Sequence, residues 1–528
     1  MTTASARHQR RFVGAVPAAV LQRARSGLAG APVLAVLVAG VAGFGWMAWL
    51  GWRKADGLTA GAFDQAYFQQ LAWSIGNGRG FTSSFNPGNF LGLHFSPLLV
   101  VPATLELAWS DARLLTLLQA AALGLTVPAA FVLIRAILGR GRAATWLAMA
   151  LAAPMPIWPI LQQQARADFH TESLALPLVL LACWAGLRRR TALLFGLAGL
   201  ALLAKEDQVY PMAVTGLLVA ARAPGRLLAP QVSGRGLRGR LGALLAGPRR
   251  AGVSLLALAV AWGVAVFGVV KPFLRAGAAH DTDPYYAWLG GGPGVLLAPF
   301  QQTGAVVDAL TRPGGWIMTA WLVAGLGGLG VLRPRWLLLV VPPVVAHLLS
   351  TNRTQQLVLG QYGLLLLVPA IVAAALGGRR LLAVLAHWQR RRRPAARVVG
   401  RPWRLAIYAV PALVAAIAAG AVPPFSAVER AFFDRPSAID RLRDVAAAVP
   451  DDAVLSVDWG LAAPLASRPV IRLLPFDEPG AYVLVDRQAF VTGTFPWDDR
   501  GGFVSRLEAS DRPVLADDGR FRLWGPVP

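Results

Sequence analysis

Clusters of arginine and lysine alternate along this chain with segments of acidic and polar residues, and long apolar stretches separate the two. A helix needs about 20 mainly apolar residues to cross the hydrocarbon core of a bilayer. Because basic residues concentrate in cytoplasmic loops, the alternation predicts an all-α polytopic membrane protein whose loops sort onto two faces. About eleven transmembrane helices are expected, at about 31–52, 112–137, 143–161, 172–187, 191–204, 208–222, 251–273, 315–332, 336–350, 356–376 and 405–423.

The composition agrees with a membrane protein rather than a nucleic-acid-binding one. The 528 residues are 55% hydrophobic and 15% charged, with a formal net charge of +24. The positive charge lies in short clusters beside apolar stretches, so attraction to anionic membrane lipids explains it better than nucleic acid does. Cys183 is the only cysteine, which excludes a disulfide framework within one chain. The sequence contains no Walker-type loop that would indicate ATP as an energy source.

The orientation of the chain follows from these basic clusters. A basic N-terminus (1–30) is expected in the cytoplasm, followed by a multi-span domain over 31–423 that begins with an outer loop at 53–111. The apolar stretch Phe95–Trp109 is ambiguous, because a span there would force Arg135, Arg140 and Arg142 to the outside. An interfacial position for this stretch puts those residues, Arg188–Arg190 and every later basic cluster inside. We therefore adopt the interfacial interpretation.

The character of the chain changes after Pro424, where long apolar runs end and aspartate becomes frequent. Short β-rich segments such as Ala453–Val457 and Tyr482–Val485 accompany a helical pattern over Ala438–Ala448. The residues 424–528 are therefore expected to form a small α/β domain of ordinary size. The orientation derived from the basic clusters places this domain outside the cytoplasm. The cell membrane is the expected location of the whole chain.

Two residues of the first outer loop are candidates for chemistry. Asp64 lies just beyond the first span, where a carboxylate can accept a proton from a hydroxyl or hold a divalent cation. It could instead cap the amphipathic helix expected over Phe63–Ile75. His94 opens an apolar stretch and could bind a phosphate or assist proton transfer, or be an interfacial histidine that lipid or backbone satisfies.

A denser group of ionisable residues stands directly before the span at 172–187: Arg166, Asp168, His170 and Glu172. If the helix starts early, Asp168 and Glu172 project from one face because they are four residues apart. Two carboxylates beside a histidine could then hold a cation or orient an acceptor hydroxyl. The alternative is that Asp168 caps the helix and that Arg166 is its surface partner.

Further polar candidates follow in later outer segments. Lys205, Glu206 and Asp207 interrupt two apolar runs, at a depth where charges usually face a cavity or one another. Lys205 could bind a phosphate with Glu206 and Asp207 orienting it, or the three could form a self-paired turn. Gln361 and Tyr362 flank a span and could contact phosphate or sugar, whereas 280–283 is better explained by surface solvation.

These residues together resemble a family of predicted bacterial and archaeal membrane proteins, the domain of unknown function 2079. The resemblance covers about the first 220 residues, and the tail matches more loosely. The stretches that carry it are Phe63–Gln70 with Trp73, Gly78–Phe81, His94–Pro97, Asp168–His170 with Glu172, and Lys205–Asp207.

That family is grouped with the GT-C glycosyltransferases, which take a sugar from a polyprenyl-phosphate carrier at the outer membrane face. The resemblance implies that Asp64 is a base or metal ligand and that Asp168 is a second acidic site. It also implies a membrane-parallel helix near 94–109. A divalent cation is allowed but not required, because Gln69 and Leu93 stand where relatives often have acids.

Two hypotheses of different kinds remain. In the preferred one, the chain transfers a sugar from a polyprenyl-phosphate donor to a cell-envelope glycan, lipid or protein, with Asp64 as base and with Lys205 and Arg166 neutralising the leaving phosphate. The alternative is a non-catalytic carrier, lipid-sugar flippase or assembly factor. The central parts of the spans are almost purely Ala, Leu, Val and Gly, whereas polar residues gather at one edge, which favours the enzyme.

Overall fold

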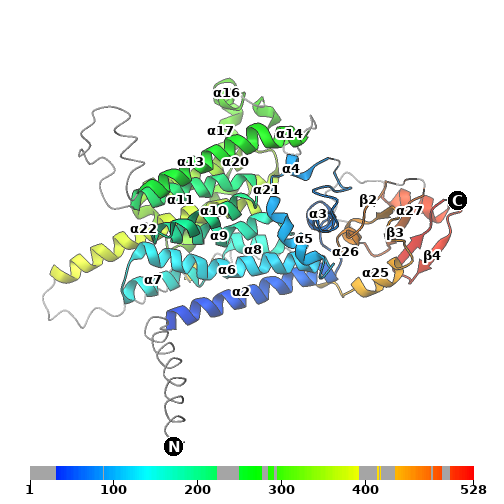
Figure 1. Cartoon of the computed structure of the whole chain (residues 1–528), viewed down its shortest axis with the longest axis horizontal. Helices are drawn as coiled ribbons and strands as arrows, with labels where there is room; N and C mark the ends of the chain where they lie inside the picture. Colours follow the sequence, from blue (N-terminus) through cyan, green and yellow to red (C-terminus); the bar gives the residue numbers. More distant parts are fainter. Residues whose placement is uncertain are drawn as a thin grey trace, which may run out of the picture.

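The computed structural model describes residues 31–86, 88–222, 249–275, 283–290, 294–391, 413–414, 417, 434–476, 478, 480–489 and 500–527. They form an elongated molecule, with a bundle of helices that ends in a small sheet domain (Figure 1). Five helical stretches of the described residues are long and apolar enough to cross a membrane: Ala31–Asp56, Arg113–Leu138, Arg142–Arg166, Arg250–Arg275 and Arg353–Trp388.

Most predicted spans coincide with helices of the bundle. The main ones are α2 (Ala31–Asp56), α6 (Arg113–Leu138), α9 (Thr171–Leu187), α10 (Thr191–Leu202), α11 (Val209–Arg222), α13 (Arg250–Ala265) and α22 (Gln361–Arg391). Helix α13 continues through a π-helical turn (Val266–Val270) into α14 (Lys271–Arg275). The predicted span at 405–423 falls largely outside the described residues, so the count of eleven stays a prediction.

Proline divides two of the predicted spans. The stretch expected at 143–161 consists of α7 (Arg142–Ala152), a 3-10 turn (Met155–Ile157) and α8 (Pro159–Arg166). The one at 336–350 consists of α19 (Pro334–Leu337), a turn (Leu338–Val340) and α20 (Val341–Leu348). Proline lacks an N–H and is tolerated in the first turn of a helix. Helices α8 and α19 begin with one, and α20 has Pro342 as its second residue. Helix α18 (Pro313–Gly325) precedes two left-handed glycines and a 3-10 turn (Leu329–Leu332).

The segment between α2 and α6 leaves and rejoins the bundle at the same end. Arg113 at the start of α6 pairs with Asp56 at the end of α2 at 3.1 Å, and its guanidinium lies over the Trp52 ring. Between them lie a π-helical turn (Ala62–Ala66), α3 (Tyr67–Gly76), α4 (Phe90–Leu93), a 3-10 turn (Pro97–Leu99) and α5 (Val100–Glu106). The stretch Phe95–Trp109 therefore does not cross the bundle, and its placement at a membrane surface stays a prediction.

The opposite ends of α9 carry opposite kinds of residue. Glu172 in its first turn pairs with Lys205, which follows α10, whereas Arg188–Arg190 follow its last residue. A helix rises about 1.5 Å per residue, so the 17 residues of α9 separate the two groups by about 25 Å. The acidic candidates thus lie at the end of the bundle that carries the tail domain, and the arginines lie at the other end.

Short helices complete the segment between α14 and α22. They are α15 (Asp283–Tyr286), a 3-10 turn (Ala287–Leu289), α16 (Gly294–Gln301), α17 (Thr303–Thr311) and α21 (Arg353–Gln356). The sequence patterns did not indicate α16 or α17.

The tail is a small α/β domain, which agrees with the prediction. Its five strands are β1 (Leu455–Val457), β2 (Ile471–Leu473), β3 (Tyr482–Asp486), β4 (Val514–Asp517) and β5 (Phe521–Trp524), in the order β2-β1-β3-β5-β4. The pairs of β1 with β2 and with β3 are parallel, and those of β5 with β3 and with β4 are antiparallel. The described part of the domain also contains the helices α25 (Ile439–Ala446), α26 (Ala462–Leu465) and α27 (Arg500–Glu508), and a 3-10 turn (Trp459–Leu461) directly before α26.

The tail domain and the loop after α2 share one hydrophobic core. Leu58, Ala60 and Ala62 are buried together with apolar residues of β1, α25 and α26. Gly460 approaches the loop so closely that a Cβ atom on it would lie 2.1 Å from the carbonyl oxygen of Leu58. The Asp111 carboxylate forms an ion pair with the Arg443 guanidinium of α25 at 2.6 Å. The tail is therefore packed directly against the segment that carries Asp64.

Candidate functional site

The π-helical turn Ala62–Ala66 gives Asp64 an open position on an otherwise buried segment. The Asp64 side chain is 53% exposed, whereas Ala62, Gln65 and Ala66 are buried. Gln65 donates to the carbonyl of Ala112 at 2.7 Å and accepts from the Phe169 N–H at 3.0 Å. This amide side chain therefore ties the turn to the chain segment that precedes α9.

That segment brings His170 to Asp64. The Nε2 atom of His170 lies 3.5 Å from the Asp64 carboxylate, and its Nδ1 lies 2.9 Å from the carbonyl oxygen of Asp168. A carbonyl only accepts, so Nδ1 carries a proton. Partial desolvation in this recess alone would raise the pKa of Asp64, but the imidazole of His170 lowers it below its ordinary value. Burial likewise opposes the charged form of His170, but Asp64 raises the pKa of this imidazole. Each group therefore favours the charged form of the other.

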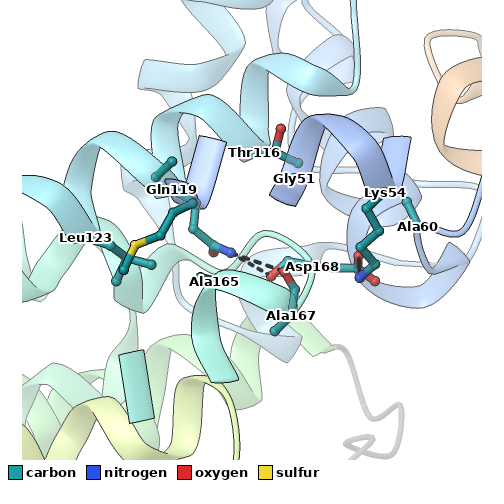
Figure 2. Close-up of a pocket in the computed structure, with 11 residues that line it drawn as sticks. Gly51, Lys54, Ala60, Thr116, Gln119, Leu123, Ala165, Ala167 and Asp168 are labelled. Carbon is teal, nitrogen blue, oxygen red and sulfur yellow. Dashed lines mark hydrogen bonds and ion pairs between the residues drawn. The ribbon is translucent and has the colours of Figure 1, made fainter. Parts of the chain in front are cut away.

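Asp168 is held by two other groups, which corrects the predicted pairing on one helical face. Helix α9 begins only at Thr171, so Asp168 lies in extended chain and does not share a face with Glu172. Its Oδ1 accepts from the Lys54 ammonium at 2.5 Å (Figure 2). Its Oδ2 accepts from the Gly61 N–H at 2.9 Å. The partner of this carboxylate is thus Lys54 of α2, and not Arg166.

A small cavity beside the Lys54–Asp168 pair is bordered by Gln119 of α6 (Figure 2). The Gln119 side-chain amide donates to the carbonyls of Gln164, Ala167 and Asp168, at 3.0 to 3.3 Å. Its oxygen accepts from the His170 N–H at 3.0 Å. Gln119 is 3% exposed, and it fixes the backbone on which Asp168 and His170 stand.

Arg166 has a different environment from the one that the sequence suggested. Its Nε donates to the carbonyl of Gln162, one turn earlier in α8, at 3.1 Å. Its own carbonyl accepts from the Lys54 ammonium at 3.1 Å. Arg166 is 8% exposed, so little of it is open to a substrate phosphate.

Lys205 is a mostly buried cation whose charge acts on both Asp64 and His170. Its ammonium forms a short ion pair with the Glu172 carboxylate, which is 2% exposed. Burial would lower the pKa of Lys205, but Glu172 and the neighbouring Asp207 and Glu206 raise it, so the group stays charged. Burial raises the pKa of Asp207 to about 7, against the lowering effect of Lys205. Asp207 can therefore gain or lose a proton near neutral pH.

Glu206 belongs to a separate ionic cluster. It accepts from Lys271 at 2.6 Å, lies 3.0 Å from His94 Nδ1, and accepts from the Phe95 N–H at 2.8 Å. Burial opposes its charge, but His94 and Lys271 bring the pKa of Glu206 well below its ordinary value. The alternative of a self-paired turn of Lys205, Glu206 and Asp207 does not hold, because Lys205 pairs with Glu172 and Glu206 pairs with Lys271.

Tyr362 and Gln361 are the first two residues of α22. Tyr362 lies near the group of Asp64, Glu172 and Lys205. Its ring packs edge to face on His347 with centroids 5.3 Å apart, and its carbonyl lies 3.1 Å from His347 Nε2. It interacts electrostatically with Lys205, Glu172 and Asp64. Residues 280–282 lie outside the described part of the chain.

The donor set does not fit a resident metal ion. Among the described residues, no three His, Cys, Asp or Glu side chains converge as ligands. The cation at the centre of the acidic residues is the Lys205 ammonium. Gln69 donates to Glu106 and to Ser467 of the tail, both at 3.0 Å. This position therefore links the loop to the tail domain.

A second cavity lies between the loop and the tail domain. Phe63, Ser84 and Phe85 line it from the loop, and the tail contributes residues 471–473, Phe476 and Glu478. The Phe63 ring, one residue before Asp64, packs edge to face on Trp459 with centroids 5.2 Å apart. This cavity opens beside the turn that carries the candidate carboxylate.

Three residues of this region were missed by sequence reasoning. Lys54 ends the first span and reads as an ordinary flanking charge. Gln119 is a polar residue inside an apolar stretch, and Lys271 is a cation near the end of one. A charged or amide group at such a depth needs a partner, which is a usable signal, although it does not name the partner.

Apolar helices of membrane-spanning length, with ionic groups gathered at one end of the bundle, define a polytopic membrane protein. Residues 54–488 match the family model "Predicted membrane protein (DUF2079)", and the chain belongs to this family. The resemblance seen in the motifs is thereby confirmed. No curated protein matches the chain.

Two kinds of solved structure resemble the chain in shape. ArnT from Cupriavidus metallidurans bound to undecaprenyl phosphate has a TM-score of 0.48 at 13% identity, over 92% of this chain and 98% of that one. The same protein in the apo state gives 0.48 at 15% identity, over 93% and 97%. The archaeal oligosaccharyltransferase AglB from Archaeoglobus fulgidus, in complex with an inhibitory peptide and a dolichol-phosphate, gives 0.39 at 13% identity, over 85% and 69%.

Proposed function

We propose that the protein is a membrane glycosyltransferase that moves a sugar from a polyprenyl-phosphate donor to an acceptor hydroxyl. One observation carries the proposal: the open carboxylate of Asp64 lies against His170 at the end of an apolar bundle where Lys205 supplies a buried cation. A base and a cation at a membrane boundary suit a substrate with an apolar tail and a phosphate head. The family's resemblance to GT-C enzymes points the same way.

In this reaction the acceptor oxygen attacks the anomeric carbon of the donor sugar. The bond from that carbon to the phosphate oxygen breaks, its electron pair leaves with the polyprenyl phosphate, and the acceptor's proton passes to Asp64. His170 keeps Asp64 ionised and oriented through their 3.5 Å contact. General-base assistance of this kind contributes typically about 10²- to 10⁴-fold to the rate.

Lys205 is proposed to neutralise the charge that develops on the leaving phosphate, where a fixed cation helps most. Glu172 holds its ammonium in place, and Asp207 can exchange a proton near neutral pH. Gln361 and Tyr362 are proposed to contact the donor from the start of α22. The Arg166 side chain binds the Gln162 carbonyl of its own helix, and His94 is bound to Glu206. We therefore propose that these two residues support the site and do not contact the substrate.

The acceptor is proposed to be a cell-envelope glycan, lipid or protein that enters from the cavity lined by Phe63 and Phe476. The tail domain and the site would then face away from the cytoplasm, with the arginines and anionic lipids on the cytoplasmic side. The membrane in question would be the cell membrane.

The test compares two aspartate variants in a transfer assay. Purified protein is given a panel of polyprenyl-phosphate monosaccharides with envelope extract as acceptor, and released polyprenyl phosphate is measured. Asp64→Asn is expected to reduce release by about 10²-fold or more. Asp440→Asn removes an aspartate that is 87% exposed in the tail, and it is expected to match the wild type.

Two outcomes contradict the proposal. Full activity of a correctly inserted Asp64→Asn protein removes the proposed base. Movement of the lipid across vesicles without release of polyprenyl phosphate by the wild type supports the alternative, a lipid-sugar flippase.

A further inference from the structure

The ion pair between Lys54 and Asp168 is not used in the proposed chemistry, although it lies next to the site. The two side chains are 16% and 10% exposed, and their charged atoms are 2.5 Å apart. Lys54 also donates to the carbonyl of Arg166 at 3.1 Å. Mostly buried ion pairs give little net stability, because desolvation offsets their attraction. A positional role would explain better why one is built here.

Asp168 contacts both chain segments that meet at the Asp64–His170 pair. Its Oδ2 accepts from the Gly61 N–H at 2.9 Å, three residues before Asp64. Its carbonyl oxygen lies 2.9 Å from His170 Nδ1. This contact orients the ring so that Nε2 points to Asp64. One residue thus sets the position of the carboxylate through its side chain and the position of the imidazole through its backbone.

The contact with Gly61 is tight enough to exclude a larger residue. A Cβ atom on Gly61 would lie 2.5 Å from Asp168 Oδ2, well inside van der Waals contact. Lys54 stands in the last turn of α2, a helix of 26 residues. The carboxylate is therefore anchored to a long helix of the bundle and not only to the loop.

We propose that Lys54 and Asp168 are positioning residues that set the separation of Asp64 and His170 by clamping Gly61 and the 168–170 segment to the end of α2. The catalytic consequence rests on the proposed function, but the geometric claim does not. Sites need supporting groups that hold their geometry within about 0.5 Å, and a misplacement of about 1 Å can cost about 10²-fold in rate.

The geometric claim can be tested without any substrate. Hydrogen–deuterium exchange at the imidazole C2 position, followed by peptide mass spectrometry, reports the pKa of His170 in the purified full-length protein. In the variant Lys54→Met/Asp168→Leu the pair is removed without a change in net charge. The pKa of His170 is expected to fall toward that of an ordinary histidine, because Asp64 is no longer held beside it.

A second variant keeps both charges and moves only the backbone contact. Gly61→Ala is expected to lower the pKa of His170 in the same way, and it serves if the double variant does not fold. Lys54→Arg retains a cation and is expected to keep the wild-type value. The control Asp308→Ala/Arg312→Ala removes an exposed ion pair at the C-terminal end of α17 and is expected to leave the pKa of His170 unchanged.

An unchanged pKa of His170 in both the double variant and Gly61→Ala overturns the proposal, whatever the protein catalyses. If the wild type transfers sugar, the two variants are also expected to lose about 10²-fold in kcat with little change in KM. If the wild type transfers none but the pKa falls as expected, the clamp stands and the proposed function fails.

Discussion

Replacement of Lys205 by methionine separates the structural role of this residue from its proposed catalytic one. The Lys205 ammonium is the cation paired with Glu172, whose side chain is 2% exposed. Loss of one partner leaves a buried carboxylate without its counter-charge, which typically costs about 3–5 kcal/mol. Lys205→Met is therefore expected to lower the thermal unfolding midpoint clearly, measured in detergent by size-exclusion chromatography after heating.

The double variant Lys205→Met/Glu172→Gln removes the charge that is left behind. Replacement of a whole buried pair by neutral groups is often close to neutral in stability, so the midpoint is expected to recover most of the loss. The release of polyprenyl phosphate is expected to stay low in both variants, because each lacks the cation that we propose to face the leaving group. The matched control is Glu172→Gln alone, which retains the cation.

Two results would refute this reasoning. A double variant that recovers transfer together with stability means that Lys205 acts only through folding. A Lys205→Met protein as stable as the wild type means that the pair is not buried as described.

Two further predictions concern pH and the docking of the tail. The Asp64–His170 ion pair stabilises the fold fully between the ordinary aspartate and histidine pKa values of about 3.9 and 6.5. Because the pKa of His170 is raised, this stabilisation is lost as pH rises through that raised value, and the pH dependence of the unfolding midpoint in wild type and Asp64→Asn checks it; equal profiles contradict it. Gly460→Ala puts a Cβ atom 2.1 Å from the Leu58 carbonyl, and overpacking costs about 1–3 kcal/mol. Limited proteolysis should therefore release the tail faster than in Gly501→Ala, where nothing lies within 4 Å, and equal rates would show that the contact can relax.

The chain divides into parts that sequence patterns predict well and parts that they do not. Long apolar helices such as α6 and α9 were placed within a residue or two, because a run of this length has only one stable structure in lipid. The breaks before Pro159 and at Leu338–Val340 were missed. The local pattern there is still apolar, and proline allows a helix to restart as well as to bend.

The candidate site shows the same division. The sequence identified Asp64, His170 and Lys205 as polar groups that need an explanation. It did not identify that Asp168 pairs with Lys54 and Glu206 with Lys271, since these partners are 114 and 65 residues apart. Charge types can be read along a chain, but the choice among several nearby cations depends on distances of a few ångströms.

The sequence by itself determined the class of protein, the helical bundle and the end of the bundle where the acidic groups gather, because apolar length and the bias of basic residues are properties of the chain alone. Only the tertiary structure decided which carboxylate is open to solvent and which already has both oxygens bound within the protein. Asp64 is 53% exposed beside His170, whereas both oxygens of Asp168 are bound. The reason is that exposure and pairing depend on how α2, the loop and the tail pack together, and that packing brings together residues that no local pattern connects.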